Sequence, residues 1–180
     1  MLLEEDKEEI EGEKSPRHIS VLTTEYLARG LDDPDYSALE AAEDTRLGDE
    51  EGTGFLLTDV IVESLGGLEV PARAFGNWRV PSTKNVIAIL ADDAPAQESL
   101  LEIWGEYRVP FKVMIYSGPF VIEGTLFSDD EDPPEFYRQA FRPIEDMIIT
   151  YLPDREAESI RAKLGLVNVF HIHGFSVEEK

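Results

Sequence analysis

The sequence predicts a mainly β (α+β) protein made of two similar small β-barrel-like repeats, joined by a helix and preceded by an acidic, disordered N-terminal tail. Three observations predict it: three blocks of sequence recur in order, strand-like alternation dominates both copies, and glutamates crowd the N-terminal segment. The predicted divisions are the tail at 1–17, the first repeat at 18–93, the linker helix at 94–111 and the second repeat at 112–180.

The recurring blocks match segments of the two copies without gaps. They are residues 19–30 with 113–124, 59–65 with 146–152, and 85–89 with 168–172. The first block places Gly30 opposite Gly124, and the second places Asp59 opposite Asp146. Because the blocks keep their order, we expect both copies to contain the same elements in the same order.

Each copy opens with alternating apolar residues that predict two extended pieces, either a hairpin or one strongly bent strand. In the second copy, Gly118 and Pro119 break the run, as is typical of a turn or bulge. The later elements are predicted in matched pairs: short helices at 36–42 and 135–140, Val/Ile-rich strands at 55–65 and 144–152, and closing strands at 85–90 and 168–173. Residues 45–54 and much of 73–83 are expected to be loops that are longer in the first copy.

The segment 95–107 between the copies predicts the connecting helix. Leu100, Leu101, Trp104 and Tyr107 recur near helical spacing, so one side of this helix is apolar. We expect that side to pack on one or both repeats. The alternative is that it binds in the groove of a partner.

The charge of the chain restricts its partners. There are 38 acidic residues against 16 Lys and Arg, for a formal net charge of -22, which repels phosphate backbones and anionic lipid surfaces. We therefore expect no nucleic acid and no membrane partner, but a protein partner, basic in character, or a second copy of the chain. The chain has no cysteine and no apolar run long enough to span a bilayer, and we expect a cytoplasmic location.

Few residues are suited to catalysis. The chain has 3 histidines, none of them in a recognisable nucleophile motif, and the glycine-rich segment 48–54 is acidic and runs into a strand rather than opening a helix. Asp59 and Asp146 would form a symmetric acid pair, but an Asp at the start of a strand usually accepts bonds from turn amides. We expect no catalytic residue and no cofactor, and we favour a protein that is not an enzyme.

The pair His171 and His173 is the one candidate metal site. Residues two apart on a strand point to one face, where two imidazoles and a nearby carboxylate would hold a metal ion. The alternatives are a strand face that carries histidines without a ligand and a pH-sensitive pair.

Each copy has a bent opening strand with a glycine, a short helix, a Val/Ile strand and a closing Asn-Val-x-x-Ile, in this order. This order resembles uncharacterised bacterial domains with tandem small Sm-like or SH3-like β-barrels, over 18–93 and 112–175. In Sm-like proteins an Asn beside the barrel helps to hold a nucleotide base. The resemblance therefore implies ligand-binding roles for Asn85 and Asn168. The Arg-Gly pair that closes the Sm-like motif is missing after both, which argues against RNA binding, and the paired-Arg motif of barrels that bind cyclic dinucleotides is also missing.

Three functions follow as hypotheses. The leading one is a non-catalytic cytoplasmic protein-interaction or scaffold protein that uses its acidic face or exposed strand edges. The alternative is a small-ligand or nucleotide-binding regulatory module with a site between the repeats, near Arg29, Asn85 or Asn168. The third is a metal-dependent enzyme that uses His171 and His173.

Overall fold

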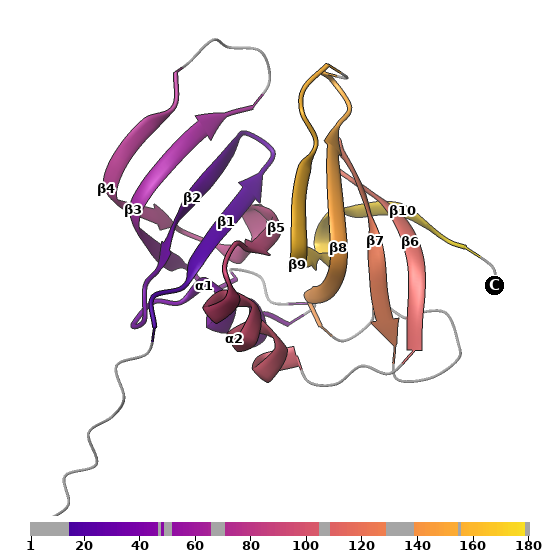
Figure 1. The fold of residues 1–180 in the computed structure, drawn as a ribbon, viewed down its shortest axis with the longest axis horizontal. Helices are drawn as coiled ribbons and strands as arrows, with labels where there is room; N and C mark the ends of the chain where they lie inside the picture. The colour runs from indigo at the N-terminus through magenta and orange to yellow at the C-terminus, as the bar shows by residue number, and fades with distance from the viewer. Residues whose placement is uncertain are drawn as a thin grey trace, which may run out of the picture.

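The computed structural model describes residues 15–46, 48, 52–65, 71–104, 109–128, 139–154 and 156–178. Within these ranges the predicted mainly β class is confirmed, since the chain forms one sheet of ten antiparallel strands with two α-helices and two short 3₁₀ helices (Figure 1). None of the described helices has both the length and the apolar character needed to cross a membrane.

The strands fall into two halves of five. The first half contains β1 (His18–Thr23), β2 (Tyr26–Asp32), β3 (Phe55–Ser64), β4 (Arg73–Val80) and β5 (Val86–Ala91), with α1 (Ala38–Asp44) after β2 and the 3₁₀ helix η1 (Thr83–Asn85) before β5. Helix α2 (Ala94–Trp104) follows. The second half contains β6 (Val109–Ser117), β7 (Phe120–Ser128), β8 (Phe141–Tyr151), β9 (Ile160–Asn168) and β10 (Ile172–Val177), with η2 (Val169–His171) before β10.

The strand order is the same in both halves. The sheet runs β10-β6-β7-β8-β9-β5-β1-β2-β3-β4, so in each half the fifth strand lies beside the first, and the fourth strand lies at the opposite end. The halves join where β5 pairs with β9, and the sheet is open, with β10 and β4 at its edges. The predicted separate barrels are therefore replaced, over the described residues, by one continuous sheet.

Both halves also contain the same backbone irregularity. The β2–β3 ladder shifts register opposite Gly30, where Asp59 has a φ of 50°, and the β7–β8 ladder shifts opposite Gly124, where Asp146 has a φ of 50°. Asp tolerates this left-handed conformation better than most residues do. Both aspartates are exposed at bulges within strands, so the expectation that they start strands is wrong.

Helix α1 begins where its polar neighbours supply the missing bonds. Ser37 Oγ accepts from the amide of Glu40, and Asp32 Oδ1 accepts from the amide of Ala38 at 2.7 Å. An N-cap of this kind is typically worth about 1 kcal/mol. The sequence prediction of a short helix here is confirmed, whereas the matching prediction at 135–140 lies almost entirely outside the described residues.

Two hydrophobic cores hold the sheet, and each contains residues of both halves. The first packs Ile19, Val21 and Ile89 with Phe141 and Leu166 from the second half. The second is centred on β6–β9 and takes in residues of β1, β2 and β5: Leu22, Leu27, Ile87, Ala88 and Leu90. Strand β5 is buried at every position, so it is covered on both faces and the two halves form one joint unit.

The predicted linker helix is present as α2, but α2 ends at Trp104, and residues 109–111 of the predicted linker belong to β6. The predicted packing of this helix on the repeats is confirmed. Ala96, Leu100 and Trp104 are buried in the first core, and α2 contacts β1 and β5 of the first half and β9 of the second. Leu101 is 49% exposed, which removes it from the predicted apolar stripe. Tyr107 lies outside the described residues.

Three sequence predictions need correction here. Residues 73–80 form strand β4 rather than a loop, and β9 was not predicted. The predicted closing strand at 168–173 is wrong, because Asn168 ends β9, η2 follows, and β10 starts at Ile172. Residues 1–14 of the predicted acidic tail lie outside the described residues. Arg17, which the prediction assigns to the tail, is instead a buried partner of Asp32, with its Nη2 2.9 Å from Oδ2 of Asp32.

The third matched block is also out of register. Ile19 pairs with Ala91 in the first half, and Val113 pairs with Val177 in the second. Ile19 and Val113 occupy the same position in the two copies, so their partners Ala91 and Val177 do as well. Counting back along the fifth strands, Val86 of β5 corresponds to Ile172 of β10. Asn85 therefore corresponds to His171. Asn168 corresponds to Ser82, and both of these residues cap a 3₁₀ helix.

Candidate functional site

The junction of the two halves is a short ladder between β5 and β9. Ala88 pairs with Val167, Ile89 with Leu166, and Leu90 with Gly165. A side chain at Gly165 would start 2.9 Å from the carbonyl oxygen of Ile89, so the glycine allows the close approach of the two halves.

Asn168 reinforces this junction. It is fully buried, its Nδ2 donates to the carbonyl oxygens of Thr83 and Val86 at 3.1 and 2.8 Å, and its Oδ1 accepts from the amide of Phe170 at 3.0 Å. Two of these bonds satisfy buried carbonyls of the first half, and the third caps η2 in the second half. The predicted ligand-binding residue Asn168 thus holds the fold together and offers no exposed surface, whereas Asn85 lies exposed at the end of η1.

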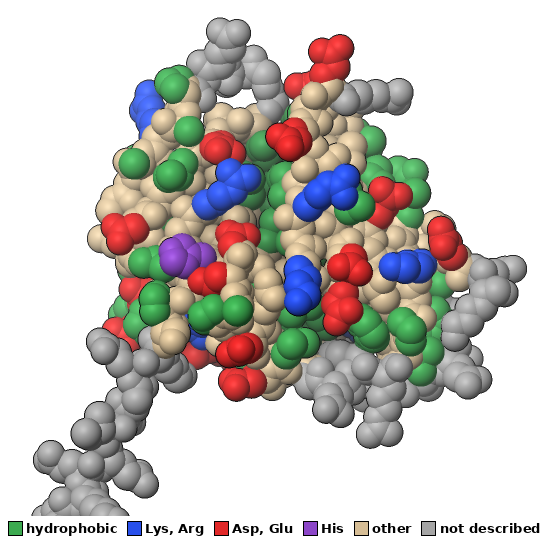
Figure 2. Space-filling model, viewed as in Figure 1, with side chains coloured by type: hydrophobic (Ala, Val, Ile, Leu, Met, Phe, Trp, Pro, Cys, Tyr) green, Lys and Arg blue, Asp and Glu red, His purple; other side chains and the backbone are tan. Residues whose placement is uncertain are grey.

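A groove of about 570 Å³ lies between the halves; we call it the inter-half groove. Buried side chains from both halves line it: Leu27, Leu90, Phe120 and Ile149. Its polar lining includes Ser20, Arg29, Glu63, Asp92 and Arg161. Figure 2 shows hydrophobic side chains between the two lobes, with basic side chains on both sides. Of the predicted site residues, Arg29 lies at this groove, while Asn85 and Asn168 do not line it.

Several polar side chains that line the inter-half groove form hydrogen bonds with one another. The Arg29 guanidinium binds the Glu63 carboxylate through one nitrogen, at 2.9 and 3.0 Å from its two oxygens. Ser20 donates to Asp92 at 2.6 Å. Burial of the carboxyl group raises the pKa of Asp92, against the lowering effects of the Ser20 hydrogen bond and the Arg29 charge.

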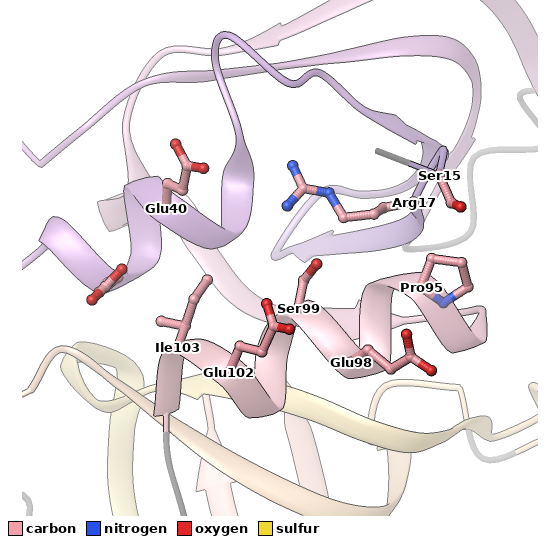
Figure 3. Close-up of a pocket in the computed structure, with 9 residues that line it drawn as sticks. Ser15, Arg17, Glu40, Pro95, Glu98, Ser99, Glu102 and Ile103 are labelled. Carbon is pink, nitrogen blue, oxygen red and sulfur yellow. The ribbon is translucent and has the colours of Figure 1, made fainter. Parts of the chain in front are cut away.

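A second cavity, of about 540 Å³, lies between α1 and α2; we call it the helix hollow. Four glutamates line it, from α1 and α2: Glu40, Glu43, Glu98 and Glu102. Figure 3 shows Glu40 across from the α2 side chains, with Arg17 extending between the two helices. Arg17 already pairs with Asp32, whose pKa is raised because burial outweighs the hydrogen bonds from Ala38 and Ser37 and the charge of Arg17. The hollow is therefore acidic, with its arginine already engaged.

The start of α2 is tied to the start of β1. Asp93 accepts from the amide of Ala96, which caps α2, and from the amide and ring of His18. Partial burial alone would raise the pKa of Asp93, but these hydrogen bonds and the His18 charge outweigh it and lower the pKa below its usual value. His18, the third histidine, is thus engaged in holding the helix on the sheet.

The two candidate metal ligands do not lie as predicted. His171 is in η2, where its Nε2 is within hydrogen-bond distance of the carbonyl oxygen of Lys84, and His173 is on β10, where the ladder to β6 shifts register. Among the described residues, no group of three or more His, Cys, Asp or Glu side chains is placed to hold a metal ion. The premise of two imidazoles on one strand face is therefore wrong.

The two edge strands are the remaining candidate surface. Strand β4 is exposed at most positions and includes Arg73, Phe75 and Arg79, while β10 has the sequence IHGFSV, with no proline and no Lys, Arg, Asp or Glu. Over the described residues, each pairs with one neighbouring strand alone, β4 with β3 and β10 with β6. Each edge therefore presents backbone amides and carbonyls that no described strand occupies.

Both edges contain a glycine in open space. A Cβ added at Gly76 of β4 or at Gly174 of β10 would meet no atom within 4 Å. These two positions are suited to substitutions that alter an edge without disturbing the packing behind it.

No family model matches the chain, and neither the curated proteins nor the solved structures contain a match to it. Sequence reasoning found Arg29 but missed the other groove residues, because Asp92 and Arg161 come from segments that meet only when β5 pairs with β9.

Proposed function

We propose that this chain is a non-catalytic interaction protein, built from a duplicated small β unit, that binds another protein by adding a strand to its sheet. The observation that carries the proposal is the open sheet, with edges at β4 and β10. Free edges bind extended segments through main-chain hydrogen bonds, while side-chain pockets add specificity.

The character of the edges supports this proposal. Proteins usually protect an edge with lysine, proline or inward-pointing charges, and β10 has none of these residues. Phe75 on β4 is 37% exposed, so this edge offers an aromatic side chain beside its backbone groups. The acidic helix hollow adds attraction for a basic partner.

Placing a lysine on either edge tests the proposal. We expect Gly76→Lys or Gly174→Lys to lose proteins that the immobilised wild-type chain retains from an extract of its source cells, because a charged edge resists strand addition. The control is Leu101→Lys, which adds the same charge to an exposed position on α2. Equal retention by all four proteins, with unchanged thermal unfolding, would contradict strand addition.

The inter-half groove favours a second candidate, a small-ligand or nucleotide-binding module. Its volume and its mixture of buried apolar and convergent polar side chains are typical of ligand sites. Arg29 is already paired with Glu63, so an anionic ligand would have to compete with that carboxylate.

Native mass spectrometry beside a denatured control tests this candidate. We expect the native chain to retain an extra mass that denaturation releases, and Arg161→Ala to lose it because this residue lines the groove. Lys163→Ala is the control, since Lys163 is exposed two positions along β9 and does not line the groove. A bare chain mass for the wild-type protein would count against the ligand.

A further inference from the structure

We infer that the inter-half groove binds an apolar zwitterion, that is, a free amino acid or a dipeptide with apolar side chains. This inference rests on the second candidate function, a small-ligand module, and names the class of its ligand. It goes beyond that candidate because it assigns a partner to each charged end of the ligand.

The floor of the groove is apolar and comes from both halves. Leu65 of the first half, with Tyr151 and Ile160 of the second, lines the groove and packs, half-buried, against the second core. Beneath them lie the fully buried side chains of Leu90 and Phe120. The volume of about 570 Å³ is typical of small-molecule sites. A ligand with apolar side chains can therefore bind by covering the half-buried residues of this floor.

The first half places polar groups in register beside the floor. Arg29 pairs with Ser20 across β1 and β2, and Ser20 pairs with Leu90 across β1 and β5. Residues directly opposite in a ladder point to the same face of the sheet, so these three side chains form a row. Asp92 follows β5 and accepts from Ser20 at 2.6 Å, which brings its carboxylate to the same row.

Three charged groups of the groove are left to bind a ligand. Among the described residues, no hydrogen bond or ion pair engages the side chains of Glu158 and Arg161. Asp92 uses Oδ2 for the Ser20 hydrogen bond, and its Oδ1 has no partner in the described part of the chain. The side chains of Arg29 and Glu63, by contrast, neutralise each other.

These free groups match a zwitterion better than other classes of ligand. A ligand carboxylate would pair with Arg161, and a ligand ammonium with Asp92, aided by the charge of Glu158. Two arginines face three acids at the groove once Arg29 and Glu63 are counted, so a phosphate or another multiply charged anion would meet net repulsion. A simple amine would leave the guanidinium of Arg161 without a partner.

The protonation of Asp92 supports this assignment. Burial raises the pKa of its carboxyl group, so the ionised form is less well stabilised here than in water. A ligand ammonium beside the carboxylate would supply positive charge at this point. Binding would therefore stabilise the ionised form of Asp92.

Isothermal titration calorimetry of the purified full chain tests the inference. The probes are L-leucine, L-methionine, L-phenylalanine, L-tryptophan and the dipeptide L-leucyl-L-leucine, which separate a free amino acid from a dipeptide as the ligand. We expect saturable binding of at least one probe. Its carboxamide, which lacks the carboxylate, and its N-acetyl form, which lacks the ammonium, should each bind about tenfold more weakly or worse. The D-enantiomer should also bind more weakly, because two charged contacts and the apolar floor fix the ligand at three points.

Variants assign each charged end of the ligand. Arg161→Ala should weaken the bound probe about tenfold or more and remove the difference between the probe and its carboxamide, which already lacks the group that Arg161 binds. Asp92→Asn, in which the amide oxygen can still accept from Ser20, should likewise remove the difference between the probe and its N-acetyl form. A general loss of folding would not produce this selectivity. Lys163→Ala, on β9 but outside the groove, should bind as the wild type does.

Two results would overturn the inference. The first is no saturable binding of any probe by the wild-type chain, and the second is equal affinity for a probe, its carboxamide and its N-acetyl form. If native mass spectrometry then finds a ligand of another class that Arg161→Ala loses, the small-ligand module stands and its assignment to an apolar zwitterion falls. The edge variants test strand addition separately, so neither result bears on that proposal.

Discussion

Replacing Gly124 with alanine is expected to lower the free energy of unfolding by about 3 kcal/mol, at the upper end of overpacking effects. The new Cβ would start 2.7 Å from the carbonyl oxygen of Glu145 and even closer to Cγ2 of Ile144. Because the first of these is a backbone atom within β8, the ladder itself must move. Urea denaturation measures the loss, provided that the slope of the transition is unchanged.

Two further glycines calibrate this expectation. Gly30→Ala should also destabilise, because its Cβ would start 2.8 Å from the carbonyl oxygen of Thr58 at the matching bulge. Gly76→Ala, in open space on β4, should change stability by less than about 0.5 kcal/mol. If Gly124→Ala changed the free energy of unfolding no more than Gly76→Ala does, the backbone at the bulge would be able to move aside for a methyl group, and the expectation of a rigid bulge would be wrong.

Replacing Asn168 with alanine is expected to cost about 3 kcal/mol, because it leaves the buried carbonyls of Thr83 and Val86 and the amide of Phe170 without their side-chain partner. Asn168→Asp should be no milder, since a carboxylate keeps the acceptor but supplies no donor for the two carbonyls. Thermal and urea unfolding both report the loss.

Asn85→Ala is the matched control for Asn168. The sequence pattern treats these residues as equivalent, but Asn85 is exposed at the end of η1, so we expect a change within about 0.5 kcal/mol. Equal effects at the two positions would contradict the structural role of Asn168.

Elements with strong local signals could be predicted from the sequence. The hairpins β1–β2 and β6–β7, strands β3 and β5, and both α-helices arise from apolar alternation, helical spacing and a turn at Gly118. Strand β4 escaped prediction because an edge strand buries little, and its sequence RAFGNWRV alternates poorly. Strand β9 carried a usable signal, since Ile160, Ala162 and Leu164 alternate with Arg161 and Lys163.

The register error in the third block has a local cause. Asn85-Val and Asn168-Val are similar in sequence, but the first ends a 3₁₀ helix and the second begins one. The resulting shift of three residues equals one 3₁₀ turn. The sequence named Arg29 for a site between the repeats, but the other groove residues and the β5–β9 junction could not be predicted, because they depend on pairing between residues far apart in the chain.

The double-sided burial of β5 has a consequence for biosynthesis. Strand β5 ends at Ala91, but the strand that pairs with its outer side begins at Ile160. At ordinary rates of translation, the ribosome takes on the order of ten seconds to make the intervening segment. During that interval we expect the nascent first half to expose Leu22, Ile87 and Leu90 together with an unpaired strand, a state that favours aggregation until the second half is made.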